Sequence, residues 1–119
     1  MKKSKGRHLI VDAHDVKSGL LENKKVMRRF LEEMPARLGM RIFRKPIIGE
    51  ISSANYPTTG LSGFVILYES HISFHTWPEE NYVAIDIYSC RDFAENEAIR
   101  YLKEYFGTKH MKVKSIIRG

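Results

Sequence analysis

The sequence lacks the features on which secreted, membrane-spanning and zinc-stapled proteins depend. It has one cysteine among 119 residues, so an internal disulfide is impossible and paired cysteine ligands for zinc are missing. No apolar run approaches the roughly 20 residues that cross a bilayer. The first eight residues are basic, but no small-residue cleavage site of a signal peptide follows them. We therefore expect a cytoplasmic protein that does not engage a membrane.

Internal repeats, linkers and low-complexity stretches are also missing, which predicts one folded domain spanning residues 1–119. The hydrophobic fraction of 43% and the charged fraction of 29% are typical of a globular protein. The net charge of +6 could attract nucleic acid, but the chain has no arginine-rich run and no alternation of basic and aromatic residues. We interpret the charge as solvated surface and predict no nucleic-acid partner; a salt-sensitive nucleic-acid binder is the remotest alternative.

Apolar periodicity predicts six strands and two helices. The predicted strands are at residues 7–13, 41–50, 63–68, 71–77, 82–90 and 110–117. Helical spacing predicts a first helix at 21–38 and a second that starts with Asp92 as its N-cap and closes at Gly107. This order predicts an α+β fold, a two-layer sandwich with a mainly antiparallel sheet and two helices on one face. The opposite face must then meet solvent, a ligand or a partner.

Two neighbouring predicted strands, at 71–77 and 82–90, concentrate the side chains that carry chemistry. Successive side chains of a strand point to opposite faces. The core face then receives the apolar residues Ile72, Phe74, Val83, Ile85 and Ile87. The opposite face receives the polar or reactive residues His71, Ser73, His75, Asp86, Tyr88 and Cys90. A half-solvated sheet without any chemistry gives the same alternation.

Three catalytic or binding chemistries compete for these residues. Ser70 with a histidine and a carboxylate suggests a hydrolase triad, but no Gly-x-Ser-x-Gly motif surrounds it. Cys90 with His75 suggests a thiol nucleophile pair. His71, His75 and Glu79 suggest metal ligands, but their four-residue spacing suits a helix, whereas the alternation predicts a strand. From the residues alone, a solvated sheet face with satisfied polar groups stays ahead of all three, and we assign no metal site.

Longer runs of sequence resemble a known family. Residues 69–79 (ESHISFHTWPE) and 84–90 (AIDIYSC) closely resemble the signature of the prokaryotic S-adenosylmethionine decarboxylases, which are small, self-processing, pyruvoyl-dependent enzymes of polyamine synthesis. Further similar segments are GRHL at 6–9, GLSG at 60–63 and RG at 118–119. The resemblance therefore spans nearly the whole chain, in the same order.

The resemblance implies a precursor that cleaves itself. In this family the bond between the glutamate and the serine of the Glu-Ser-His motif breaks autocatalytically, which corresponds here to Glu69 and Ser70. The Ser70 Oγ would attack the Glu69 carbonyl, and elimination and hydrolysis would leave a pyruvoyl group on residue 70. The matching positions give Ser62 and His75 as processing residues, with His75 transferring a proton. The chains expected after cleavage are 1–69 and 70–119.

The resemblance also implies a cofactor and a reaction. The pyruvoyl group derived from Ser70 would form a Schiff base with the amine of a small-molecule substrate and accept the electrons released with carbon dioxide. Cys90 matches the proton donor to the resulting carbanion. Glu79 matches the acid that binds both ribose hydroxyls, and Tyr56 matches the aromatic residue that stacks on adenine. The implied substrate is S-adenosylmethionine.

Alternatives to this function stay open. Some members of the family decarboxylate arginine or ornithine, and Glu79 would pair equally well with a guanidinium or ammonium group. The loop at 56–60 (YPTTG) displaces the usual proline, and Lys5 stands where relatives commonly have an apolar residue. These departures motivate a non-catalytic regulatory paralogue as the alternative from a different class. The family forms dimers, so the resemblance also predicts a homodimer of processed protomers.

Overall fold

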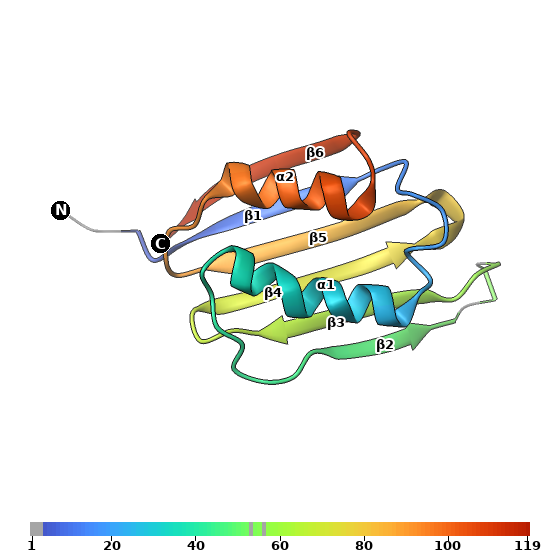
Figure 1. Ribbon diagram of the computed structural model, residues 1–119, viewed down its shortest axis with the longest axis horizontal. Helices are drawn as coiled ribbons and strands as arrows, with labels where there is room; N and C mark the ends of the chain where they lie inside the picture. The colour runs from blue at the N-terminus through green and yellow to red at the C-terminus, as the bar shows by residue number, and fades with distance from the viewer. Residues whose placement is uncertain (1–3, 53, 56) are drawn as a thin grey trace.

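The computed structural model describes residues 4–52, 54–55 and 57–119. Within them, one six-stranded sheet has the order β2-β3-β4-β5-β1-β6 and is antiparallel at every pairing. The strands are β1 (Gly6–Ala13), β2 (Ile47–Ile51), β3 (Gly60–Ile66), β4 (Ser70–Trp77), β5 (Tyr82–Ser89) and β6 (Met111–Arg118). The helices are α1 (Lys24–Arg37), α2 (Glu95–Phe106) and the short 3-10 turn η1 (Pro78–Glu80). Both α-helices lie over the same face of the sheet (Figure 1), which confirms the predicted α+β sandwich.

The hydrophobic core fills the space between this face and the two helices. The side chains of β4 and β5 predicted to face the core are all buried, namely Ile72, Phe74, Val83, Ile85 and Ile87. Phe30 of α1 packs between the layers, with its ring centroid 6.4 Å from that of Phe74 and 5.2 Å from that of Phe106 in α2. Burying a side chain of this size contributes about 1.5–3 kcal/mol, so Phe30 holds both helices to the sheet.

The first helix begins later than helical spacing predicted. Asn23 caps α1, because its side chain accepts a hydrogen bond from the Val26 N–H at 3.1 Å. Leu21 therefore precedes the helix, although it packs into the core with only 2% of its surface exposed. Pro35 lies inside the last turn without ending the helix, and Gly39 follows the end with φ of 70°, a left-handed conformation that favours glycine.

Three other predicted boundaries are wrong. The strand predicted at 63–68 is found at Gly60–Ile66, because Leu67 and Ser70 close the hairpin and Tyr68 lies in its loop. Asp92 is not the N-cap of α2; Ala94 occupies that position without a side-chain hydrogen bond, and the helix starts at Glu95. The strand predicted at 41–50 begins only at Ile47, since the preceding Pro46 has no N–H to pair. The residues just after Met40 instead lie against the β3–β4 hairpin through the bridge between Ile42 and Leu67. This contact positions part of the site described below.

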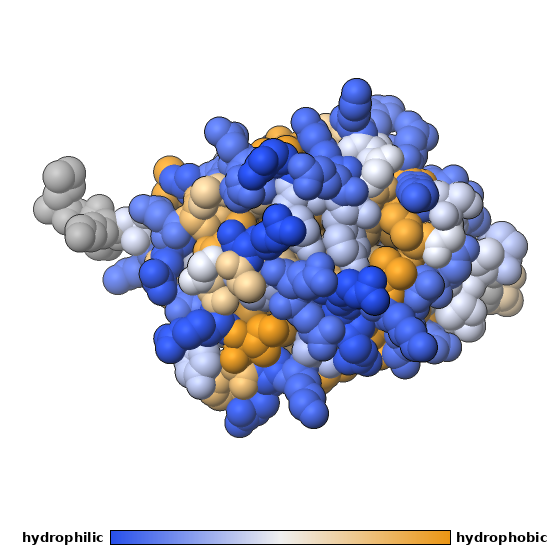
Figure 2. All heavy atoms as spheres, viewed as in Figure 1, coloured by the Kyte–Doolittle hydropathy of each residue, from blue (hydrophilic) through white to orange (hydrophobic). Residues whose placement is uncertain are grey.

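The face of the sheet away from α1 and α2 is covered by no described element. On the helix side, hydrophilic side chains predominate at the surface (Figure 2). The opposite face combines polar residues of β3, β4 and β5 with an exposed apolar corner formed by Ile47, Phe64 and Ile66. Among the described residues, no helix is long and apolar enough to span a membrane.

Candidate active site

The link between β3 and β4 is a hairpin with a two-residue loop, Tyr68-Glu69. Leu67 and Ser70 close it through two backbone hydrogen bonds of 2.8 and 3.2 Å. The turns that best match the twist of such a hairpin need positive φ, and neither loop residue has it. The loop must therefore be held by contacts from elsewhere in the chain.

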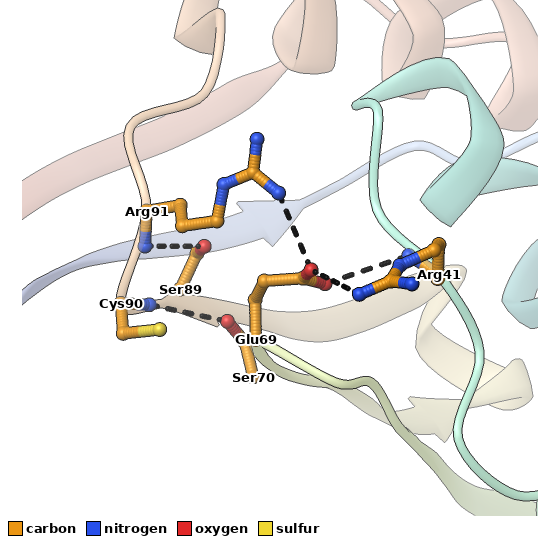
Figure 3. A network of polar contacts seen from close by, with 6 residues as sticks. All are labelled: Arg41, Glu69, Ser70, Ser89, Cys90 and Arg91. Carbon is orange, nitrogen blue, oxygen red and sulfur yellow. Dashed lines mark hydrogen bonds and ion pairs between the residues drawn. The ribbon is translucent and has the colours of Figure 1, made fainter.

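The backbone amide of Cys90 contacts both groups that an acyl shift from Glu69 to Ser70 would involve. The Cys90 N–H donates to the Glu69 carbonyl oxygen at 3.1 Å. It also donates to the Ser70 Oγ at 3.2 Å (Figure 3). Pairing of Ser70 with Ser89 at the end of β5 brings Cys90 to this position. A hydrogen bond from this amide polarises the carbonyl, and the same amide binds the neighbouring hydroxyl, which favours an N-to-O acyl shift. The Cys90 side chain is exposed and its thiol is free.

The Glu69 carboxylate is enclosed by two arginines, although its loop is at the surface. Its side chain is 7% exposed; the Arg91 Nη1 lies 3.3 Å from one carboxylate oxygen and the Arg41 Nη2 3.7 Å from the same oxygen. The Arg41 backbone N–H donates to the other oxygen at 3.5 Å. Burial acts to raise the pKa of Glu69, but the hydrogen bond and charge of Arg41, together with Arg91, outweigh it and hold the pKa below its ordinary 4.5.

A second group of predicted residues lies at the other end of β4. Register pairs Ser62 with His75, and their Oγ and Nδ1 atoms are 2.7 Å apart. Glu79, in η1, accepts a hydrogen bond from the Thr58 hydroxyl. These residues, with Trp77 and others, line a cavity of about 130 Å³. Ligand pockets usually measure about 300–1,000 Å³, so this cavity is smaller than a nucleoside-sized ligand needs.

The chain does not bring these two groups together. Ser70 and His75 are five residues apart on β4, a separation of about 17 Å in an extended strand. Glu69, Ser70 and Cys90 therefore form one cluster, which we call the cleavage cluster. Ser62, His75 and Glu79 form the second, which we call the histidine cluster. Tyr56 lies outside the described residues.

This separation also bears on the three chemistries suggested by the residues alone. Within one chain neither Ser70 nor Cys90 meets His75, so neither a hydrolase triad nor a thiol pair assembles there. His71 and His75 lie on a strand, about 13 Å apart along its axis, rather than on one helical turn. Among the described residues, no group of three or more histidine, cysteine or acidic side chains is arranged to hold a metal ion.

Sequence patterns did not identify three residues that complete the two clusters. Arg41 and Arg91 contact Glu69 from segments remote in sequence, and Thr58 contacts Glu79 in the same way. Of the three, only Arg91 had a signal in the sequence, because it directly follows the candidate residue Cys90. Spacing within a single element carries no information on such contacts.

Comparisons with known proteins agree across the chain. A family model described as S-adenosylmethionine decarboxylase matches residues 7–119. An S-adenosylmethionine decarboxylase proenzyme from Clostridium botulinum (strain Loch Maree) is 35% identical over 118 residues, which cover 98% of this chain and 97% of the relative. Another proenzyme of that name, from Acetivibrio thermocellus, is 30% identical over 115 residues, covering 96% of this chain and 88% of the relative. The crystal structure of the adenosylmethionine decarboxylase from Aquifex aeolicus superposes with a TM-score of 0.84 at 25% identity, over 99% of this chain and 93% of that one.

Proposed function

The chain belongs to the S-adenosylmethionine decarboxylase family, and from this premise we propose that it cleaves itself at Ser70 and then decarboxylates S-adenosylmethionine. The curated relatives are named proenzymes, in keeping with a chain that matures by cleavage. The observation that carries the proposal is the Cys90 N–H, which contacts the Glu69 carbonyl oxygen and the Ser70 Oγ together. No other function suggested by the sequence requires this coincidence.

The proposed cleavage is redox-neutral and consumes one water. The Ser70 Oγ attacks the Glu69 carbonyl carbon, the peptide C–N bond breaks, and an ester with a free Ser70 amine results. Loss of the Ser70 Cα proton expels the Glu69 carboxylate from Cβ and leaves dehydroalanine. Water then replaces the nitrogen, ammonia departs, and residue 70 becomes a pyruvoyl group. The products are chains 1–69 and 70–119.

Proton transfer in this sequence needs a base that the cleavage cluster lacks. The Ser62–His75 pair supplies one, because the 2.7 Å contact orients the imidazole. Since His75 lies about 17 Å along β4 from Ser70, we propose that it acts on the Ser70 of a second copy in a homodimer. A two-fold axis makes both composite sites equivalent. The same pairing would enlarge the small cavity beside His75.

The decarboxylation divides its tasks between the same two clusters. The pyruvoyl carbonyl, once formed at residue 70, supplies an electron sink conjugated to the substrate amine. The exposed Cys90 thiol can return a proton to the substrate carbon after carbon dioxide leaves. Glu79 would accept hydrogen bonds from the ribose hydroxyls, and its bond to Thr58 already fixes the direction of the carboxylate. Tyr56 would stack on the adenine.

Denaturing mass spectrometry tests the cleavage. We expect two fragments divided between Glu69 and Ser70, the second with a blocked N-terminus, and an intact chain for Ser70→Ala. Carbon dioxide release is then measured with S-adenosylmethionine, arginine and ornithine. Turnover of arginine or ornithine alone would keep the reaction class and replace the substrate. An intact wild-type chain that is inert toward all three would favour the regulatory paralogue.

A further inference from the structure

We propose that Arg41 and Arg91 are positioning residues for the self-cleavage, acting through the Glu69 carboxylate to hold the bond to Ser70 against the Cys90 amide. This inference rests on the proposed function and assigns a role to two residues outside the family motif as read from the sequence. Neither arginine approaches the reacting atoms in the described contacts; both reach the side chain of the residue that carries the reacting carbonyl.

The first argument is that the loop needs external support. Tyr68 and Glu69 close a two-residue hairpin without the positive φ that the favoured turns use. Arg41 contacts both loop residues. Its carbonyl accepts the Tyr68 N–H at 3.0 Å and its guanidinium lies 4.7 Å from the centre of the Tyr68 ring, while its backbone N–H and its guanidinium also contact the Glu69 carboxylate. Phe43 packs against the same ring at 5.2 Å between centroids. The segment after α1 therefore holds the loop from one side.

The second argument is that Glu69 is held at both of its ends by adjacent residues. The Cys90 N–H contacts the backbone carbonyl of Glu69. The Arg91 guanidinium contacts the Glu69 carboxylate (Figure 3). Two neighbouring residues after β5 thus fix both the reacting carbonyl and the side chain that orients it. A rotation of the Glu69 peptide plane would break the contact of the carbonyl with the Cys90 N–H or strain the contact of the carboxylate with Arg91.

The third argument is the balance of charge. Two guanidinium groups face one carboxylate in the uncleaved chain. Elimination from Ser70 releases a second carboxylate, the new α-carboxylate of Glu69, on the same residue. The surplus positive charge therefore favours the group that leaves, and it retains the new chain end after cleavage.

Exposure argues against an ordinary surface ion pair. The Glu69 side chain is 7% exposed, whereas those of Arg41 and Arg91 are 72% and 65% exposed. Ion pairs whose charged groups are exposed contribute little to stability. Removing one arginine should change the thermal midpoint little, because the other guanidinium and the Arg41 backbone N–H still contact the Glu69 carboxylate. The direction of that carboxylate is nevertheless less well fixed.

The test compares cleavage rates of freshly synthesised precursor by denaturing mass spectrometry. Misplacing a reacting group by about 1 Å can cost on the order of 100-fold in rate, so we expect about tenfold for Arg91→Ala or Arg41→Ala and about 100-fold for the pair. Glu69→Gln should be slow as well, and adding it to the double variant should slow cleavage no further. Lysine at both positions should restore part of the rate. Arg100→Ala is the matched control, since Arg100 is also 65% exposed but pairs with Glu97 on α2.

A second measurement follows the new chain end. In processed wild type, a carboxypeptidase should spare Glu69, whereas in the processed double arginine variant it should remove it. The inference is overturned if the arginine variants cleave at the wild-type rate, or if their rates fall only in proportion to a lowered thermal midpoint without rescue by lysine. A wild-type chain that never cleaves would instead overturn the proposed function.

Discussion

At the scale of single residues, the proposed function gives Cys90 two separable tasks. Its backbone N–H contacts the Glu69 carbonyl and the Ser70 Oγ, whereas its thiol is exposed and makes no described contact with either. Cleavage should therefore depend on the amide, and substrate turnover on the thiol. Substitutions at this one position separate the two.

Cys90→Ala keeps the amide, so we expect cleavage at close to the wild-type rate followed by a large loss of decarboxylation. Cys90→Pro removes the N–H, and loss of one such donor costs about 100- to 1,000-fold, so that variant should remain almost uncleaved. Mass spectrometry over time measures the first step and carbon dioxide release the second. Rapid cleavage of a folded Cys90→Pro chain would show that the amide is dispensable.

The lowered pKa of Glu69 predicts how the stability of the fold depends on pH. Its folded pKa is lowered from 4.5, with Arg41 and Arg91 outweighing burial, so the carboxylate stabilises the fold above its unfolded pKa. That stabilisation is lost as the pH falls through the lowered folded pKa. In an uncleaved Ser70→Ala background, adding Glu69→Gln should lower the thermal midpoint at neutral pH and leave it unchanged in strong acid. A pH-independent difference would contradict this assignment.

What the sequence predicted at this scale follows from periodicity. Alternation placed Ile72 and Phe74 in the core and His75 outside it, because a strand fixes those directions locally. Arg41, Arg91 and Thr58 were missed, since each meets its acidic partner across 20 or more positions of chain. The family resemblance identified the residues with assigned roles, but those roles stay predictions.

At the scale of elements, β3 is fitted closely against its neighbours. A Cβ added at Gly63 would lie 2.7 Å from the Phe74 ring and 3.0 Å from Ile48. Gly49, on the adjoining β2, has its nearest neighbouring atom 4.0 Å away. Gly49 can therefore serve as the control for Gly63, because both lie in the same sheet but only Gly63 lacks room for a Cβ.

Gly63→Ala should destabilise the fold by about 1–3 kcal/mol, since the ring of Phe74 is fixed in the core and cannot yield freely. Gly49→Ala should change stability much less. Urea unfolding of both variants in the uncleaved Ser70→Ala background measures the difference. Equal midpoints for the two variants would mean that the Phe74 ring relaxes at little cost.

The wrong element boundaries share one cause, which is competition between local signals. Leu21 and Asp92 carry helix signals, apolar spacing and a capping carboxylate, but Asn23 and Ala94 hold the cap positions. Pro46 interrupts the predicted second strand, and the residues before it dock on the β3–β4 hairpin instead. The Asn23 cap and the missing N–H of Pro46 are local features that spacing alone did not weigh, whereas the docking of the residues after Met40 is a tertiary contact.

At the scale of the whole molecule, the open sheet face and the divided site make one prediction. The two clusters lie about 17 Å apart along β4, so no motion short of unfolding that strand joins them within a chain. In two copies related by a two-fold axis, the cleavage cluster of each copy can meet the histidine cluster of the other. The distance therefore makes the oligomer part of the proposed chemistry rather than an addition to it.

Complementation between two inactive chains tests this directly. Ser70→Ala lacks the proposed nucleophile and His75→Ala lacks the proposed base, so each alone should remain uncleaved. Co-expressed, they form mixed dimers in which an intact Ser70 meets an intact His75 at one of the two sites, and about half of the His75→Ala chains should then be cleaved if pairing is random. Size exclusion reports the dimer, and mass spectrometry reports which chain is cut. If the mixture stays whole while mixed dimers form, His75 does not act across the interface.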